Sequence, residues 1–151
     1  MAMRNFLLTL HIFSAIAGFG VSFAFPFIGA LAQKPGAPIA WFLKLNHNLG
    51  RWLEVFALTV QPGTGAGLII TQHVSPWQSQ NRWLLASIII YVVAIAYSNF
   101  VQNPGVKKAI DMAEAQQFGP EFGTRMKRLA QGGQFLTLAL VAIIILMVVK
   151  P

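Results

Sequence analysis

The chain has 151 residues, of which 56% are hydrophobic and only 10% are charged, and its formal net charge is +7. A soluble domain carries about 25% charged residues, so these charges are too few to cover a water-facing surface. The absence of cysteine excludes disulfides, thiolate-held iron–sulfur clusters and covalent c-type haem. The basic residues lie in short segments beside apolar stretches, which indicates contact with a lipid bilayer rather than nucleic-acid binding.

Four charge-free stretches organise the chain, at residues 5–33, 55–81, 83–106 and 129–149. A helix needs about 20 apolar residues to cross the hydrocarbon core, and each stretch reaches that length. We therefore predict an all-α protein, a four-helix transmembrane bundle with up-down topology that forms a single domain over residues 1–151. The helices are expected near 6–30, 50–72, 83–101 and 132–149. The tryptophans are predicted to mark the membrane interfaces: Trp41, Trp52, Trp77 and Trp83.

Each predicted helix carries a stripe of small or polar residues, and we expect these stripes to face the bundle interior. In the first helix the stripe is His11, Ser14, Gly18 and Ser22. In the second it is His47, Glu54, Gln61, Gly65 and Gln72. In the third it is Ser87, Tyr91, Ala94 and Ser98, and in the fourth it is Gln134, Thr137 and Val141.

Two further features stand out in the second helix. Pro62 lacks an amide hydrogen and its ring clashes with the carbonyl of Leu58, so a kink is expected there. Arg51 and Glu54 are three residues apart, a spacing that favours an ion pair. Together with His47 they form, in an alternative interpretation, the mouth of a proton path.

The segment between the third and fourth helices predicts a short amphipathic helix over residues 106–117 on the cytoplasmic membrane surface. It follows Asn103-Pro104-Gly105 and precedes Gly119-Pro120, which are helix start and stop signals. Of the 11 Lys and Arg residues, eight lie in this segment, in the first loop or at the start of the second helix, and three lie on the other side. The positive-inside rule then predicts both termini outside, in a bacterial inner membrane.

His11 is the main candidate functional residue. It lies about 9 Å into the first helix from Asn5, and an ionisable residue inside the membrane indicates a functional site. Its imidazole suits an axial ligand of haem iron, a ligand of copper or another transition metal, or a proton relay. His73 ends the second helix at the same membrane face and is the candidate second metal ligand, although an interfacial histidine is more often solvated.

Three short segments carry a resemblance: Leu-His-Ile-Phe-Ser-Ala at 10–15, Gln-Pro-Gly-Thr-Gly at 61–65 and Met-Val-Val-Lys-Pro at 147–151. The chain resembles a bacterial family of predicted integral membrane proteins that is distantly similar to copper-resistance D-type membrane domains and to the J-type protoporphyrinogen oxidase. The resemblance implies a haem b role for His11, because that oxidase has a histidine in a similar first-helix setting. The oxidase relies on a lysine where this chain has Arg82 and Trp83, which argues against protoporphyrinogen oxidation.

The leading hypothesis is a membrane protein that binds haem b and acts in redox chemistry or electron transfer. His11 and His73 are the expected iron ligands, and the Phe-rich first helix with Gly18 and Gly20 is expected to supply an apolar wall for the porphyrin. The alternative is a non-catalytic accessory subunit of a larger membrane complex or of a homo-oligomer, which the small-residue stripes favour. A copper or small-ion channel lacks a ring of carboxylates or a ladder of methionines.

Overall fold

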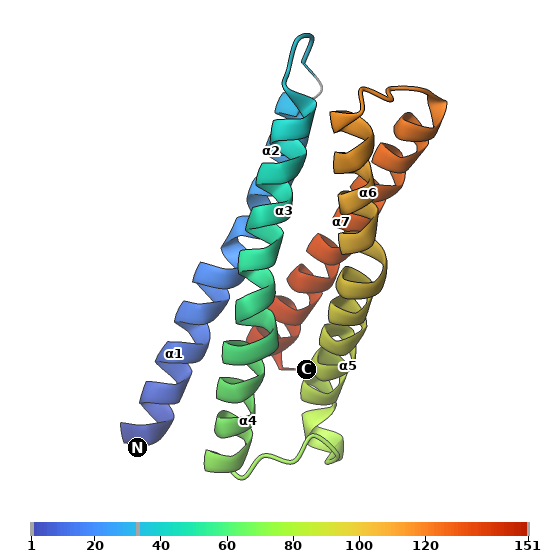
Figure 1. Ribbon diagram of the computed structural model, residues 1–151. Coiled ribbons are helices and arrows are strands. Elements are labelled where there is room, and N and C mark those ends of the chain that lie inside the picture. Colours follow the sequence, from blue (N-terminus) through green and yellow to red (C-terminus); the bar gives the residue numbers. More distant parts are fainter. Residues whose placement is uncertain (1, 33, 151) are drawn as a thin grey trace.

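The computed structural model describes residues 2–32 and 34–150, which form helices joined by short turns (Figure 1). Three residues lie outside this described part: Met1, Gln33 and Pro151. Gln33 is the last residue of the first charge-free stretch, and Pro151 is the last residue of the closing Met-Val-Val-Lys-Pro segment. Four helical spans are long and apolar enough to cross a membrane: Ala2–Ala32, Ile39–Thr71, Ser79–Glu114 and Pro120–Val149. Consecutive spans run in opposite directions (Figure 1), which confirms the predicted up-down bundle.

The helix type changes within three of the spans. The first consists of α1 (Ala2–Phe19), a 3-10 segment η1 (Gly20–Ala24) and α2 (Phe25–Ala32). The second consists of α3 (Ile39–Val55), a π-helical segment η2 (Phe56–Val60) and α4 (Gln61–Thr71). The third consists of η3 (Ser79–Asn81), α5 (Arg82–Tyr97), a π-helical segment η4 (Ser98–Gln102) and α6 (Asn103–Glu114). The fourth is α7 alone (Pro120–Val149).

Each π-helical segment ends two residues before a proline, Pro62 in one case and Pro104 in the other. A proline inside a helix leaves the carbonyl four residues earlier without its donor and collides with it. A wider π turn just before the proline relieves that collision and is a common cause of helix distortion. The distortion expected at Pro62 therefore takes the form of one enlarged turn.

The extra residue of a π turn also rotates the following helix face by about one residue, or 100°. The stripe predicted for the second helix is accordingly divided between two neighbouring helices. Gln61 hydrogen-bonds to α1, whereas His47 and Glu54 line a cavity shared with α6. Gln72, the last member of the predicted stripe, is exposed.

The predicted starts of the second and fourth helices, at residues 50 and 132, are too late, because α3 begins at Ile39 and α7 at Pro120. Charged residues ended the apolar stretches on which those predictions rest, but a helix continues into water without difficulty. Trp41 and Trp52 consequently lie on one helix, eleven residues and about 16 Å apart along its axis. The two side chains therefore lie at different heights along α3, and the assignment of the tryptophans to the membrane interfaces stays a prediction.

The extended helix ends form a small cap, which we define as residues 39–50, 103–114 and 120–128. The cap holds the main hydrophobic cluster: Leu43, Val106, Ala109, Ile110, Ala113 and Phe122. Burial of large apolar side chains between helices is driven by water, whereas lipid gives no such drive. The cluster thus indicates that the cap lies outside the hydrocarbon region, where Lys44 and Glu114 also form an ion pair between α3 and α6.

The predicted amphipathic helix is present as α6, but it does not lie on the membrane surface. It continues α5 through η4, and its apolar face packs against α3 and α7 instead of lipid. The charged face, with Lys107, Lys108 and Asp111, is exposed. An amphipathic helix has the same residue pattern whether its apolar face packs on other helices or on lipid. The sequence could therefore not distinguish the two.

Below the cap, most of the buried residues are small or polar, as expected for helices packed in lipid. Two of the buried residues are large and apolar, Leu68 and Leu84; the others are Ser14, Gly18, Ser22, Ala57, Gln61, Thr64, Ser87, Gly132 and Ala139. The stripe predicted for the first helix is therefore confirmed at its three small residues. The stripe predicted for the fourth is wrong: Gln134 and Val141 are exposed, while Gly132 packs so closely on α5 that a Cβ there would lie 2.6 Å from the Tyr97 hydroxyl.

The bundle is built from two closely packed pairs, α1 with α4 and α5 with α7, which α3 and α6 join in the cap. A hydrogen bond from the Tyr91 hydroxyl to the Ala57 carbonyl also links the pairs. The ring of Tyr91 packs edge-to-face on Phe19, with 6.4 Å between the ring centroids. The cavities described below lie between the second and third spans.

Candidate functional site

A cluster of polar side chains joins α1 to α4 inside the apolar part of the bundle. His11 Nδ1 lies 2.7 Å from Thr64 Oγ1, and the Ser14 hydroxyl donates a 2.8 Å hydrogen bond to Gln61 Oε1. Ser14, Gln61 and Thr64 are buried and His11 is half-buried. The sequence identified His11, Ser14 and Gln61 as inward-facing, but it did not single out Thr64, which follows Gln61 by three residues on the same helix face.

The bonds of Thr64 favour one of the two tautomers of His11. The Thr64 hydroxyl lies 2.7 Å from the Val60 carbonyl, one turn earlier in the helix. A hydroxyl has a single proton, and donation to that carbonyl leaves only its lone pairs for His11. With the hydroxyl bonded in this way, Nδ1 carries the proton and Nε2 carries the lone pair. Nε2 has no hydrogen-bond partner among residues 2–32 and 34–150.

A hydrogen bond through Nδ1 leaves Nε2 of a histidine open to another partner. A ligating imidazole normally donates its other N–H to a carboxylate, a carbonyl or another acceptor, which fixes both tautomer and ring orientation. Thr64 provides that acceptor for His11. Gly65 lies beside the ring, since a Cβ there would be 3.5 Å from His11 Cε1, an ordinary van der Waals contact.

The other two predicted cofactor residues are placed differently. His73 is exposed in the turn after α4, with a φ angle of 53°. It lies nine residues beyond Thr64, the partner of His11, or about 13 Å along the helix, and its pairing with His11 stays a prediction. Gly18 faces the second span, where an added Cβ would lie 2.6 Å from Phe56 Cβ. Its observed role is close helix packing.

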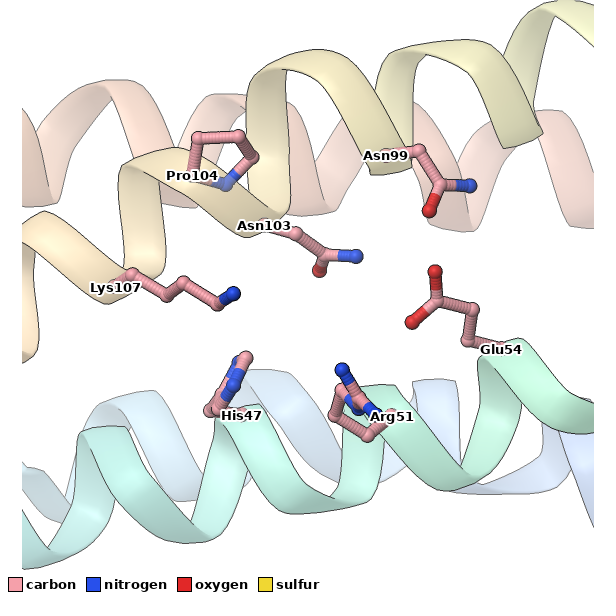
Figure 2. A pocket seen from close by; sticks show the side chains of 7 residues that line it. All are labelled: His47, Arg51, Glu54, Asn99, Asn103, Pro104 and Lys107. Carbon is pink, nitrogen blue, oxygen red and sulfur yellow. The ribbon is translucent and has the colours of Figure 1, made fainter.

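A second polar site lies between α3 and α6, where the cap meets the membrane part of the bundle. Figure 2 shows side chains from the two helices pointing toward one another across a cavity of about 150 Å³. The polar lining residues are His47, Arg51, Glu54, Asn99, Asn103 and Lys107. Sequence reasoning missed the last three, although their spacing of four residues places them on one helix face.

The ion pair expected between Arg51 and Glu54 is not formed. In the described ranges, ion pairs join Lys44 to Glu114 and Arg125 to Glu121, and neither involves a cavity residue. Both Arg51 and Glu54 point across the cavity toward α6 and η4 rather than along α3 (Figure 2). With Lys107, the cavity therefore has two basic side chains and one acid, which leaves an excess positive charge.

Four apolar spans under a small cap with its own hydrophobic cluster define a multi-pass integral membrane protein. A family model described as "Predicted integral membrane protein (DUF2269)" matches residues 5–151, and the chain belongs to this family. The match confirms the predicted membrane family and the lipid bilayer as its surroundings. No curated protein matches the chain. No solved structure matches it either.

Proposed function

We propose that the protein binds haem b through Nε2 of His11 and takes part in electron transfer within the membrane. The observation that supports this most is the hydrogen bond from His11 Nδ1 to Thr64, which leaves Nε2 available to a metal. A haem, once bound, supplies one-electron chemistry at its iron. The chain contributes the imidazole, its fixed orientation and apolar surroundings.

The donor set fits a haem better than a bare metal ion. Among the described residues there is no group of three His, Cys, Asp or Glu side chains that could hold a metal ion. A haem brings four nitrogen ligands of its own and needs only one or two axial residues. His11 is the first of these, and His73 is the candidate for the second. Phe6, Phe13 and Phe23 are exposed along the first span and available for contact with a porphyrin edge.

The test is a haemin titration of purified protein in detergent, followed by its Soret absorption. We expect saturable binding by the wild type and no such binding by His11→Gln, whose amide still donates to Thr64 but does not ligate iron. His47→Gln is the matched control, since His47 lies in the other polar site, and it should bind as the wild type does. Equal binding by wild type and His11→Gln would show that His11 is not the ligand.

We also propose that the protein lies in the bacterial inner membrane with both termini outside. Most basic residues lie in and around the cap, which the positive-inside rule assigns to the cytoplasm. An alkaline-phosphatase fusion after Lys150 should then be active and a green-fluorescent-protein fusion there should be dark. If the green-fluorescent-protein fusion were fluorescent and the phosphatase fusion inactive, the assigned orientation would be wrong. The distant similarity to copper-resistance and oxidase domains, and association with a second copy or a larger complex, stay predictions.

A further inference from the structure

An apolar groove of about 420 Å³ lies directly below the polar cavity, between the same two spans. Its walls come from η2 and α4 on one side and from α5 and η4 on the other, and include Leu58, Pro62, Ile95 and Phe100. Leu58 and Phe100 are 51% and 82% exposed, so the groove opens sideways toward lipid. An alkyl chain therefore has lateral access to it.

The cavity and the groove are continuous, because Asn99 lines both. Arg51 and Lys107 stand at the cap end of the combined site, and Pro62 and Tyr91 stand at the membrane end. Lys107 immediately follows the charge-free stretch 83–106, and Arg51 lies four residues, or one helical turn, before the stretch 55–81. The polar half thus lies at the membrane boundary and the apolar half lies within the hydrocarbon region, which is the orientation of a membrane amphiphile.

Charge complementarity indicates the sign of the head group. Arg51 and Lys107 have no acidic partner within ion-pair distance in the described ranges, and Asn99 and Asn103 add amide donors. Arginine presents a planar fork of donors that matches phosphate oxygens, and lysine adds a point charge. Both basic side chains are accessible, so a head group reaches them without opening the bundle.

The two π-helical segments lie at the same site. Ala57 and Leu58 belong to η2, and Asn99 and Phe100 belong to η4, so both segments form walls of the combined site. Such segments occur frequently at functional sites. Here they face each other across the junction between the polar and apolar halves.

We propose that the cavity and groove bind one anionic membrane amphiphile, with its phosphate head held by Arg51 and Lys107 and its apolar chain along Leu58 and Phe100. The site is separate from His11, and the proposal holds whether or not haem is bound. The test has two competing outcomes. In one, the site prefers a cation, which Glu54 would hold; in the other, it binds free phosphate that has no apolar chain.

The experiment is native mass spectrometry of the purified full chain in a neutral detergent, titrated with dioleoyl phosphatidylglycerol. We expect one tightly bound lipid, weaker binding of dioleoyl phosphatidylcholine and little competition by inorganic phosphate. The Arg51→Gln/Lys107→Gln variant should bind phosphatidylglycerol about tenfold more weakly, because two charge-assisted hydrogen bonds are lost. The control Lys108→Gln/Lys127→Gln removes two exposed cap charges and should stay within about twofold of wild type.

Two single variants keep the test decisive if the double variant fails to fold. Glu54→Gln removes the one acid of the cavity and should tighten phosphatidylglycerol binding. Ala96→Phe fills the groove from an exposed position and should weaken binding, whereas Ala30→Phe, at an exposed position of α2, should not. Equal losses in the two charge-removal variants, weaker binding by Glu54→Gln, or inorganic phosphate binding as tightly as the lipid would overturn the proposal.

Discussion

Replacement of Gly18 by leucine should destabilise the bundle severely, while the same replacement at Gly20 should be tolerated. A Cβ at residue 18 would lie 2.6 Å from Phe56 Cβ and 3.0 Å from its Cγ, which belong to the part of the side chain next to the backbone and cannot swing away. Relief requires α1 and η2 to separate. Overpacking of this kind costs about 1–3 kcal/mol or more.

The comparison with Gly20 makes this prediction specific. A Cβ at residue 20 meets nothing within 4 Å, and the residue is exposed. Both changes add the same side chain to the same span, so they share any general effect on hydrophobicity. The apparent melting temperature, measured by circular dichroism in detergent, should fall clearly for Gly18→Leu only. Equal melting temperatures for the two variants would contradict the close packing of α1 on η2.

The second prediction concerns Thr64 and rests on the proposed function. Thr64→Val keeps the shape of the side chain but removes the acceptor for His11 Nδ1–H. The imidazole then loses both its fixed tautomer and its orientation, and loss of such a partner typically costs 10–100-fold in metal affinity. We expect the dissociation constant for haemin, from a Soret titration, to rise by about that factor.

Thr71→Val is the matched control for that change. The Thr71 hydroxyl also donates to a carbonyl one turn earlier, that of Gly67 at 2.8 Å, but the residue is exposed at the end of α4. The two variants thus remove the same kind of backbone hydrogen bond from the same helix. If Thr71→Val weakened haemin binding as much as Thr64→Val does, the special role of Thr64 would be wrong.

Hydropathy predicted the four spans because a bilayer demands uninterrupted apolar stretches of sufficient length. The length of an apolar stretch reflects the thickness of the hydrocarbon core, but it does not give the full length of the helix. Glu54 ended the second stretch in the sequence, yet α3 runs through it and through Arg51 and Lys44 as well. The cap, which is built from these extensions, could therefore not be located from the charge-free stretches.

The faces of the helices were predictable only where the helix is regular. In α1 the spacing of Ser14 and Gly18 placed both residues correctly in the interior. In the second span, η2 adds a residue to one turn, and the faces before and after it no longer coincide. Pro62 signalled a distortion, but nothing in the residue pattern distinguishes a bend from a rotation.

The polar cavity could not be derived for a related reason. The cavity lies between α3 and α6. The amphipathic pattern of α6 equally allowed a position on the membrane surface, where α6 would have been far from α3. The His11 cluster was more accessible to sequence reasoning, since the residue spacing had already placed both His11 and Gln61 on inward faces. Its most informative feature, the proton position on His11, depends on distances that only the structure gives.

The most direct test of the account is the visible absorption spectrum of the wild-type protein purified from haem-sufficient cells, before and after reduction with dithionite. The account predicts a Soret band with the sharpened visible bands of reduced haem b, in stoichiometric amount, and their loss in His11→Gln. A pure, folded wild-type protein without a Soret band, or an unchanged spectrum in His11→Gln, would contradict it.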